Sequence, residues 1–302
     1  MRCLPATLRA VVLAASVASL AASVPAAAQQ QAPEGSEIVL QALATLQRAP
    51  SLSASVRYTT AAEGDELLGT GRYLQRGTGQ QRLSRLELQS QVAGETASLQ
   101  QVFDGKFLWT EKRLPSGRSV SRVDVRRLLG GVAAAPRSLS DSPYRPDPLV
   151  ETALARGGMA ALVADLYTRF QFGPARQVQH QGEAVWAVVG SWTPEGLARA
   201  LGEDGSEAAW PPVVPDHALL LVSLVDRLPR VVEYRRHRDA DLRSGPSSIV
   251  PCRDPLVRYE LFDVRLGPVL SLDEFRYVPG EVQVVDHTPL AAARIDEVAP
   301  RR

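Results

Sequence analysis

Four histidines are the residues of this chain whose side chains most readily support catalysis or metal binding. They are His180, His217, His237 and His287, far apart in the sequence, each near a turn or a charged neighbour. The sequence contains no G-x-S-x-G elbow, no Walker A loop, no H-E-x-x-H segment and no paired cysteines. We therefore expect no enzyme, no metal site and no cofactor.

A basic run from residue 235 to residue 238 is followed by Asp239 and Asp241. A strand sends alternate side chains to opposite faces, so this run would divide its charge between two faces. The two aspartates have the spacing of part of a cation-binding loop, but the other ligands of such a loop are missing. A solvated edge strand explains the segment. The formal net charge of +1 gives no indication of a nucleic-acid partner.

Four tryptophans could be core residues or platforms for a ligand. They are Trp109, Trp186, Trp192 and Trp210. Trp109 and Trp186 fall on predicted strands, where core packing is the simpler explanation, whereas Trp210 lies in a proline-rich loop that is less easily buried. The sequence is compatible with both roles.

The first 28 residues have the pattern of a cleaved secretory signal peptide. The first nine residues contain Arg2 and Arg9 and no acidic residue. An alanine-rich apolar run follows, and three alanines precede Gln29. Cys3 stands ahead of the apolar run, so it cannot be the lipidated cysteine of a mature lipoprotein. Cleavage would leave a net charge of −1 and a single cysteine, Cys252, which we expect to be a free thiol.

The chain has two lysines among 34 basic residues and no asparagine, which indicates a GC-rich bacterial coding bias and hence a periplasmic destination.

The segment from Leu99 to Arg113 predicts a β-hairpin around Asp104 and Gly105. With Phe103 opposite Lys106, Val102 would pair with Phe107, and Gln100 with Trp109, on one face of the sheet. Neither face of this hairpin is wholly polar. We therefore expect a sheet that has something to cover or enclose on each side.

The elements that would position these residues begin with a helix from Ser36, as N-cap, to Pro50, followed by a meander of strands. The strands are predicted at 52–61, 66–75, 81–92, 95–103, 106–114 and 118–125. Gly69 and Gly71 inside the second strand indicate a bulge or a sharp bend.

Two sheet segments are separated by predicted helices at 125–129, 149–155 and 159–170. Strands follow at 172–180 and 184–192, then a helix at 194–201, a hairpin at 217–225 and 230–238, and strands at 256–266, 275–280 and 282–285. The apolar phase slips between Leu261 and Phe262, which indicates a bulge. No repeat of solenoid period is present.

The segments V-F-D-G-K-F-L-W and D-E-F-R-Y-V-P-G resemble those of LolA-like periplasmic carriers that sort outer-membrane lipoproteins. The chain is also similar to LolA-like secreted proteins of planctomycete-type bacteria. Asp104, Gly105 and Trp109 match the hairpin of that family, and Phe275, Tyr277, Pro279 and Gly280 match its final strand. The resemblance implies an α+β fold: an open, curved antiparallel half-barrel with helices covering its concave face, in one domain over residues 29–287 with a tail at 288–302.

In such a fold a hydrophobic cavity would lie between sheet and helices. The candidate lining residues are Val56, Tyr58, Tyr73, Leu86, Leu88, Val102, Phe107 and Trp109. The carriers also hold a lid closed with an arginine, and Arg82 or Arg85 falls in the corresponding region. The proline and tryptophan that accompany that arginine in the family are absent here.

The resemblance implies a non-enzymatic periplasmic carrier for a lipid or a lipoprotein acyl chain. A roughly 16-carbon chain left in water costs on the order of 12 kcal/mol, so a carrier must offer it an apolar concavity. No nucleotide motif is present, so membrane donor and acceptor proteins would have to drive loading and release. The alternative is an envelope-stress sensor or protein-interaction module, since the stress regulator RseB resembles the same half-barrel. We expect a monomer.

Overall fold

The computed structural model describes residues 33–62, 65–92, 94–130, 149–201, 214–236, 255–289 and 291. The chain divides into two compact units, Met1–Gln31 and Ala32–Arg302. The first unit, which contains the whole expected signal peptide (1–28), lies outside the described residues. So do His237, Asp239, Asp241, Trp210 and Cys252.

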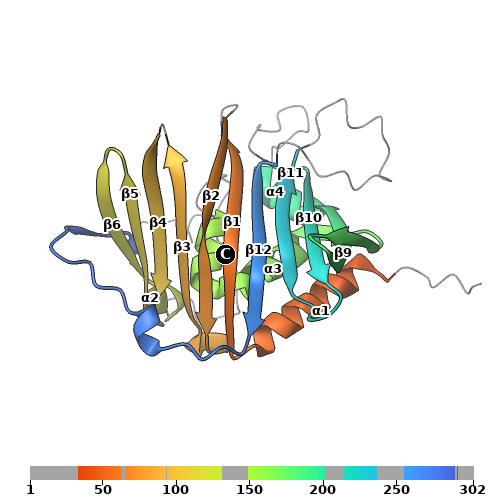
Figure 1. The fold of residues 1–302 in the computed structure, drawn as a ribbon, viewed down its shortest axis with the longest axis horizontal. Coiled ribbons are helices and arrows are strands. Elements are labelled where there is room, and N and C mark those ends of the chain that lie inside the picture. Colours follow the sequence, from red (N-terminus) through yellow and green to blue (C-terminus); the bar gives the residue numbers. More distant parts are fainter. Residues whose placement is uncertain are drawn as a thin grey trace, which may run out of the picture. The chain divides into compact units, whose positions relative to one another are not determined.

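The described residues of the second unit form one open sheet of thirteen strands, shown in Figure 1. The strands are β1 (Ser51–Ala62), β2 (Asp65–Arg76), β3 (Leu83–Val92), β4 (Glu95–Phe103), β5 (Phe107–Leu114), β6 (Gly117–Asp124), β7 (Phe170–Phe172), β8 (Arg176–His180), β9 (Glu183–Trp192), β10 (His217–Ser223), β11 (Pro229–Arg235), β12 (Val257–Leu266) and β13 (Val284–Asp286). Their order is β13-β6-β5-β4-β3-β2-β1-β12-β11-β10-β9-β7, with β8 paired to β9. The predicted α+β fold with an open, curved, mostly antiparallel sheet is confirmed.

The long-range pairing of β1 with β12 joins the two sheet segments. Between Ser53 and Ser55 the pairing gains one residue in β12, and Asp263 there has φ +51°. A bulge is therefore present in this strand, just after Phe262 and not between Leu261 and Phe262 as predicted. The register of β2 runs through Gly69 and Gly71 without a shift, so neither glycine marks a bulge.

Helices α1 (Gly35–Arg48) and α3 (Leu149–Arg169) lie on one face, which we call the helix face; Figure 1 shows α3 behind the sheet. Ile38, Val39, Ala42 and Leu46 recur along one side of α1 and are buried against the sheet, as their helical spacing predicts. The helix begins at Gly35, with Glu34 rather than Ser36 at the N-cap position. The two shorter helices are α2 (Val125–Gly130) and α4 (Pro194–Leu201).

The two helices predicted at 149–155 and 159–170 are continuous apart from a kink at Gly158, where φ is +65° and ψ is −164°. Only glycine adopts this backbone region without strain. Among the described residues, no helix is long and apolar enough to cross a membrane.

The other face of the sheet carries residues 267–289, which we call the strap, so this face is the strap face. The strap leaves β12, forms the short 3-10 helix η4 (Leu272–Phe275) and reaches β13, which runs parallel to β6 (Figure 1). The strand predicted at 275–280 is wrong, because this part of the strap has no strand pairing. Its backbone carbonyls at Leu270, Glu274 and Pro279 accept hydrogen bonds from Arg76, Arg85 and Arg118 of the sheet. Arginine side chains thus replace the ladder bonds that a strand would make.

The turn of the Asp-Gly hairpin is longer than predicted. Val102 pairs with Trp109, and Phe103 with Leu108, two residues out of the expected register. The reason is Asp104, whose Oδ1 accepts the backbone N–H groups of Lys106 at 2.9 Å and Phe107 at 2.7 Å. Its Oδ2 accepts the Trp109 indole N–H at 3.0 Å. One carboxylate therefore ties the turn to the tryptophan five residues later.

Candidate ligand-binding site

Five of the proposed lining residues lie together on the helix face. Val56, Tyr73, Leu86 and Leu88 are buried in the main apolar core, and Tyr58 is partly buried beside them. The same core contains Val39 and Leu46 of α1 and Leu162, Val163 and Leu166 of α3. In the part of the chain that the structure describes, side chains of the two helices thus fill the space above these five residues.

Val102, Phe107 and Trp109 lie on the strap face instead. Since Val102 pairs with Arg85 and Trp109, and side chains alternate along each strand, all three project away from the main core. The Trp109 ring lies 5.7 Å from that of Phe107 and 5.4 Å from that of Tyr277 of the strap. Trp109 therefore contacts the strap, and the three residues do not share a space with the five on the helix face.

Trp186 and Trp192 lie partly buried against the main core, and the Trp192 indole donates a 2.6 Å hydrogen bond to the Pro215 carbonyl. Core packing therefore accounts for both.

The two candidate gating arginines point to opposite faces. Arg85 lies on the strap face, where it forms an ion pair with Glu87 and donates to the Glu274 carbonyl. Arg82 precedes β3 on the helix face, where it is 8% exposed. Arg82 lies beside an open space.

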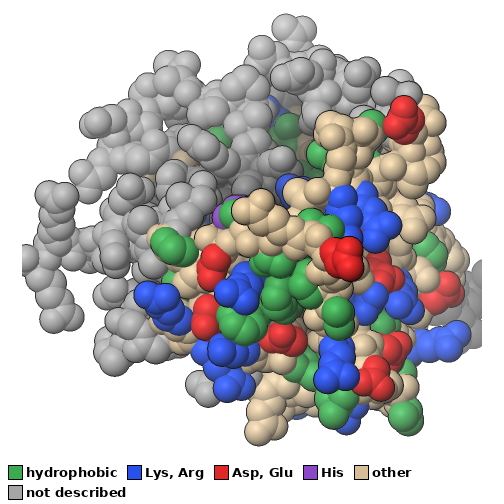
Figure 2. All heavy atoms as spheres, turned by 90° about the vertical axis from the view of Figure 1, so that its left-hand side faces the viewer, with side chains coloured by type: hydrophobic (Ala, Val, Ile, Leu, Met, Phe, Trp, Pro, Cys, Tyr) green, Lys and Arg blue, Asp and Glu red, His purple; other side chains and the backbone are tan. Residues whose placement is uncertain are grey.

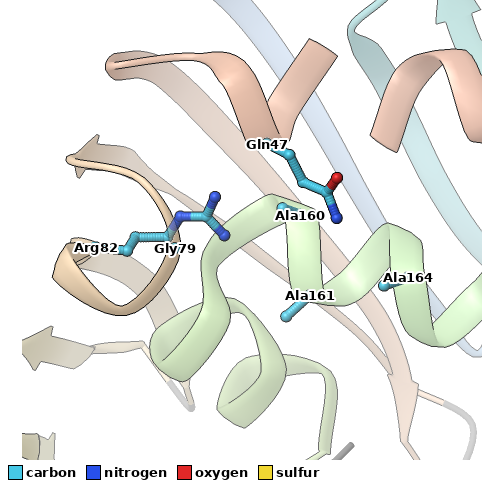
Figure 3. Close-up of a pocket in the computed structure, with 6 residues that line it drawn as sticks. All are labelled: Gln47, Gly79, Arg82, Ala160, Ala161 and Ala164. Atoms are coloured by element: carbon cyan, nitrogen blue, oxygen red, sulfur yellow. The ribbon is translucent and has the colours of Figure 1, made fainter. Parts of the chain in front are cut away.

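That space is a hollow of about 370 Å³ between α1, α3 and the short 3-10 helix η1 (Gly79–Gln81). Its described lining residues are Gln47, Gly79, Arg82, Ala160, Ala161 and Ala164. Figure 3 shows the Arg82 guanidinium and the Gln47 amide directed toward the same space, with the three alanines on α3 opposite. The sequence analysis did not identify the three alanines as lining residues. The available signal was their spacing, i, i+1 and i+4, which places them on one side of a helix.

A buried hydrogen-bond cluster positions the alanine-bearing half of α3. The Tyr73 hydroxyl accepts the Met159 backbone N–H at 3.0 Å and donates to Gln75 Oε1 at 2.8 Å. Burial raises the pKa of Tyr73, and it lowers the pKa of Arg82 below its usual range. The turn at Gly158 and the helix that follows are therefore held from the sheet by a neutral phenol.

The described histidines do not converge. His180 Nε2 lies 3.1 Å from Glu260, His217 Nδ1 lies 2.9 Å from Asp216, and the His287 backbone N–H donates to the Arg122 carbonyl. No group of three or more His, Cys, Asp or Glu side chains among the described residues could hold a metal ion.

The strap is held at its centre by Glu111, whose side chain is 5% exposed. It accepts hydrogen bonds from Arg118 at 2.9 Å, Tyr277 at 2.6 Å and Arg113 at 2.5 Å. Figure 2, which faces the β6 end of the sheet, shows hydrophobic side chains interleaved with basic and acidic ones. Burial raises the pKa of Glu111, but the hydrogen bonds from Arg118, Tyr277 and Arg113 outweigh it and lower the pKa to about 2.

We expect this carboxylate to make the stability of the protein depend on pH. Its folded-state pKa is depressed, so its contribution, at most about 3 kcal/mol, is complete above the unfolded pKa near 4.5 and is lost as the pH falls toward 2. Urea unfolding at pH 7 and pH 3 should show wild type well above Glu111→Gln at pH 7 and a smaller difference at pH 3. An equal difference at both pH values would contradict the assignment.

No protein-family model matches the chain, and no curated protein matches it. Solved structures with a similar chain path include a conserved protein from Thermus thermophilus, with 13% identity and a TM-score of 0.42 over 83% of this chain and 97% of that one. MucB of Pseudomonas aeruginosa, in its complex with MucA, has 11% identity and a TM-score of 0.37 over 80% of this chain and 60% of that one.

The similar structures also include a LolA superfamily protein. It comes from Nitrosomonas europaea and has 16% identity and a TM-score of 0.30 over 82% of this chain and 99% of that one.

Proposed function

We propose that the protein is a non-enzymatic carrier of the bacterial periplasm that binds a lipid or a lipoprotein acyl chain on its helix face. The observation that carries this proposal is the hollow between α1, α3 and η1, where a cationic side chain meets small apolar ones. A hydrocarbon chain gains about 0.8 kcal/mol for each CH₂ group that it buries. Even a partial fit therefore gives useful affinity.

The hollow lies at the edge of the main core, with which it shares Ala160. Because side chains of α1 and α3 fill the space over the sheet in the described residues, a ligand would lie at the margin of these helices. Loading and release then need no opening of the main core, and membrane partners could exchange the ligand at an exposed site. Binding as a monomer suffices for this arrangement.

Co-purification tests the proposal. The protein should be expressed with its own first 28 residues, recovered from the periplasm, and extracted with organic solvent for mass spectrometry. We expect about one lipid molecule per protein molecule, and a mature chain that begins at Gln29. A lipid-free protein that also fails to bind a fluorescent fatty acid would contradict the carrier function.

A protein-interaction module is the second candidate. It is favoured by the filled main core, which leaves a large lipid no room above Val56, Tyr73 and Leu86. In the same purification, a stoichiometric protein partner without lipid would support this function instead.

A further inference from the structure

The hollow has different chemistry at its two ends. Arg82 and Gln47 form one end, and Ala160, Ala161 and Ala164 form the other (Figure 3). We propose that it binds a single-chain amphiphile with an anionic head group, the head at Arg82 and the hydrocarbon along the alanines. This inference rests on the proposed function and names the class of lipid.

The polar end fits a carboxylate or a phosphate ester. A guanidinium presents a planar fork of N–H donors that matches the oxygens of either group in a bidentate geometry. Arg82 is 92% buried, so an anion beside it experiences a stronger attraction than it would in water. The Gln47 amide adds N–H donors from α1. None of the described lining residues is acidic, so nothing in that set repels an anion.

The apolar end fits a hydrocarbon chain. Ala160, Ala161 and Ala164 lie on one side of α3. Ala160 is buried at the edge of the main core, whereas Ala161 and Ala164 are partly exposed and present methyl groups to the open space. Larger apolar residues at positions 161 and 164 would fill the hollow, as Leu162, Val163 and Leu166 fill the core on the other side of the helix.

The size of the hollow favours one chain over two. A volume of about 370 Å³ is near the lower limit of small-molecule sites. This accommodates a head group and part of one chain.

Calorimetry with four probes tests the inference on the full chain. Dodecanoate and dodecyl phosphate should bind at least about tenfold more tightly than dodecanol, and inorganic phosphate should bind more weakly than any of them. Arg82→Gln should remove the advantage of the two anions, whereas Arg48→Gln should not. Arg48 is the matched control because it is exposed in the last turn of α1, next to Gln47, and does not line the hollow.

A second variant keeps the test decisive if Arg82→Gln fails to fold. Ala161→Phe fills the hollow without removing charge and should weaken all three twelve-carbon probes together. Equal binding of dodecanol and dodecanoate would overturn the anionic head group but leave the carrier function intact. Inorganic phosphate binding as tightly as dodecyl phosphate would overturn the amphiphile. If no probe with a chain binds, both the inference and the proposed function fail.

Discussion

Replacing Gly158 with alanine is expected to lower the free energy of unfolding by about 3 kcal/mol or more. At φ +65° and ψ −164° an alanine is strained, and its Cβ would lie 2.2 Å from the Tyr73 hydroxyl oxygen and 2.4 Å from Gln75 Oε1. The kink positions the half of α3 that lines the hollow, so ligand binding should fall as well. Urea unfolding at pH 7 measures the first effect and calorimetry with dodecanoate the second.

Gly182→Ala is the control, because Gly182 also has a positive φ, +80°, but has open space around its Cβ position. Gly182→Ala should lower the free energy of unfolding by only about 1 kcal/mol. In a Tyr73→Phe background, the clash with the hydroxyl is absent, so Gly158→Ala should cost less than it does in wild type. Equal costs in the two backgrounds would show that the phenol does not hold this kink.

Replacing Gly71 with alanine should destabilise the sheet by about 3 kcal/mol or more. Its Cβ would lie 1.7 Å from the Glu87 carbonyl oxygen and 3.0 Å from the Leu88 Cα, and no side-chain rotation relieves a clash with backbone. The measurement is the free energy of unfolding in urea.

The neighbouring Gly69→Ala is the matched control on the same strand and face. Its Cβ would lie 3.3 Å from the Gln89 carbonyl oxygen, a contact that a small shift can relieve, so we expect a cost below about 1 kcal/mol. If the two variants are equally stable, the close approach of β2 and β3 at Gly71 is not the reason for glycine there.

Local sequence signals predict most of the helices and strands, and they predict how the hairpin residues divide between the two faces of the sheet. Alternating apolar residues and turn residues are local signals, so the strands of the meander and the helices α1 and α4 lie within a few residues of their predicted bounds. Alternation also places Val102, Phe107 and Trp109 on one face, as predicted, even though the pairing register moved by two residues.

What covers each face of the sheet depends on contacts between residues that are far apart in the sequence. The pattern of β4 and β5 is the same whether helices or a strap lie above it, so Trp109 could not be assigned to the strap without the contact to Tyr277. The hollow likewise depends on contacts between distant parts of the sequence. Gln47, Arg82 and Ala161 come from three elements, and small helical residues carry little signal of their own. Their proximity depends on the Tyr73 hydroxyl, which holds α3 at Gly158 by a contact between residues 86 positions apart.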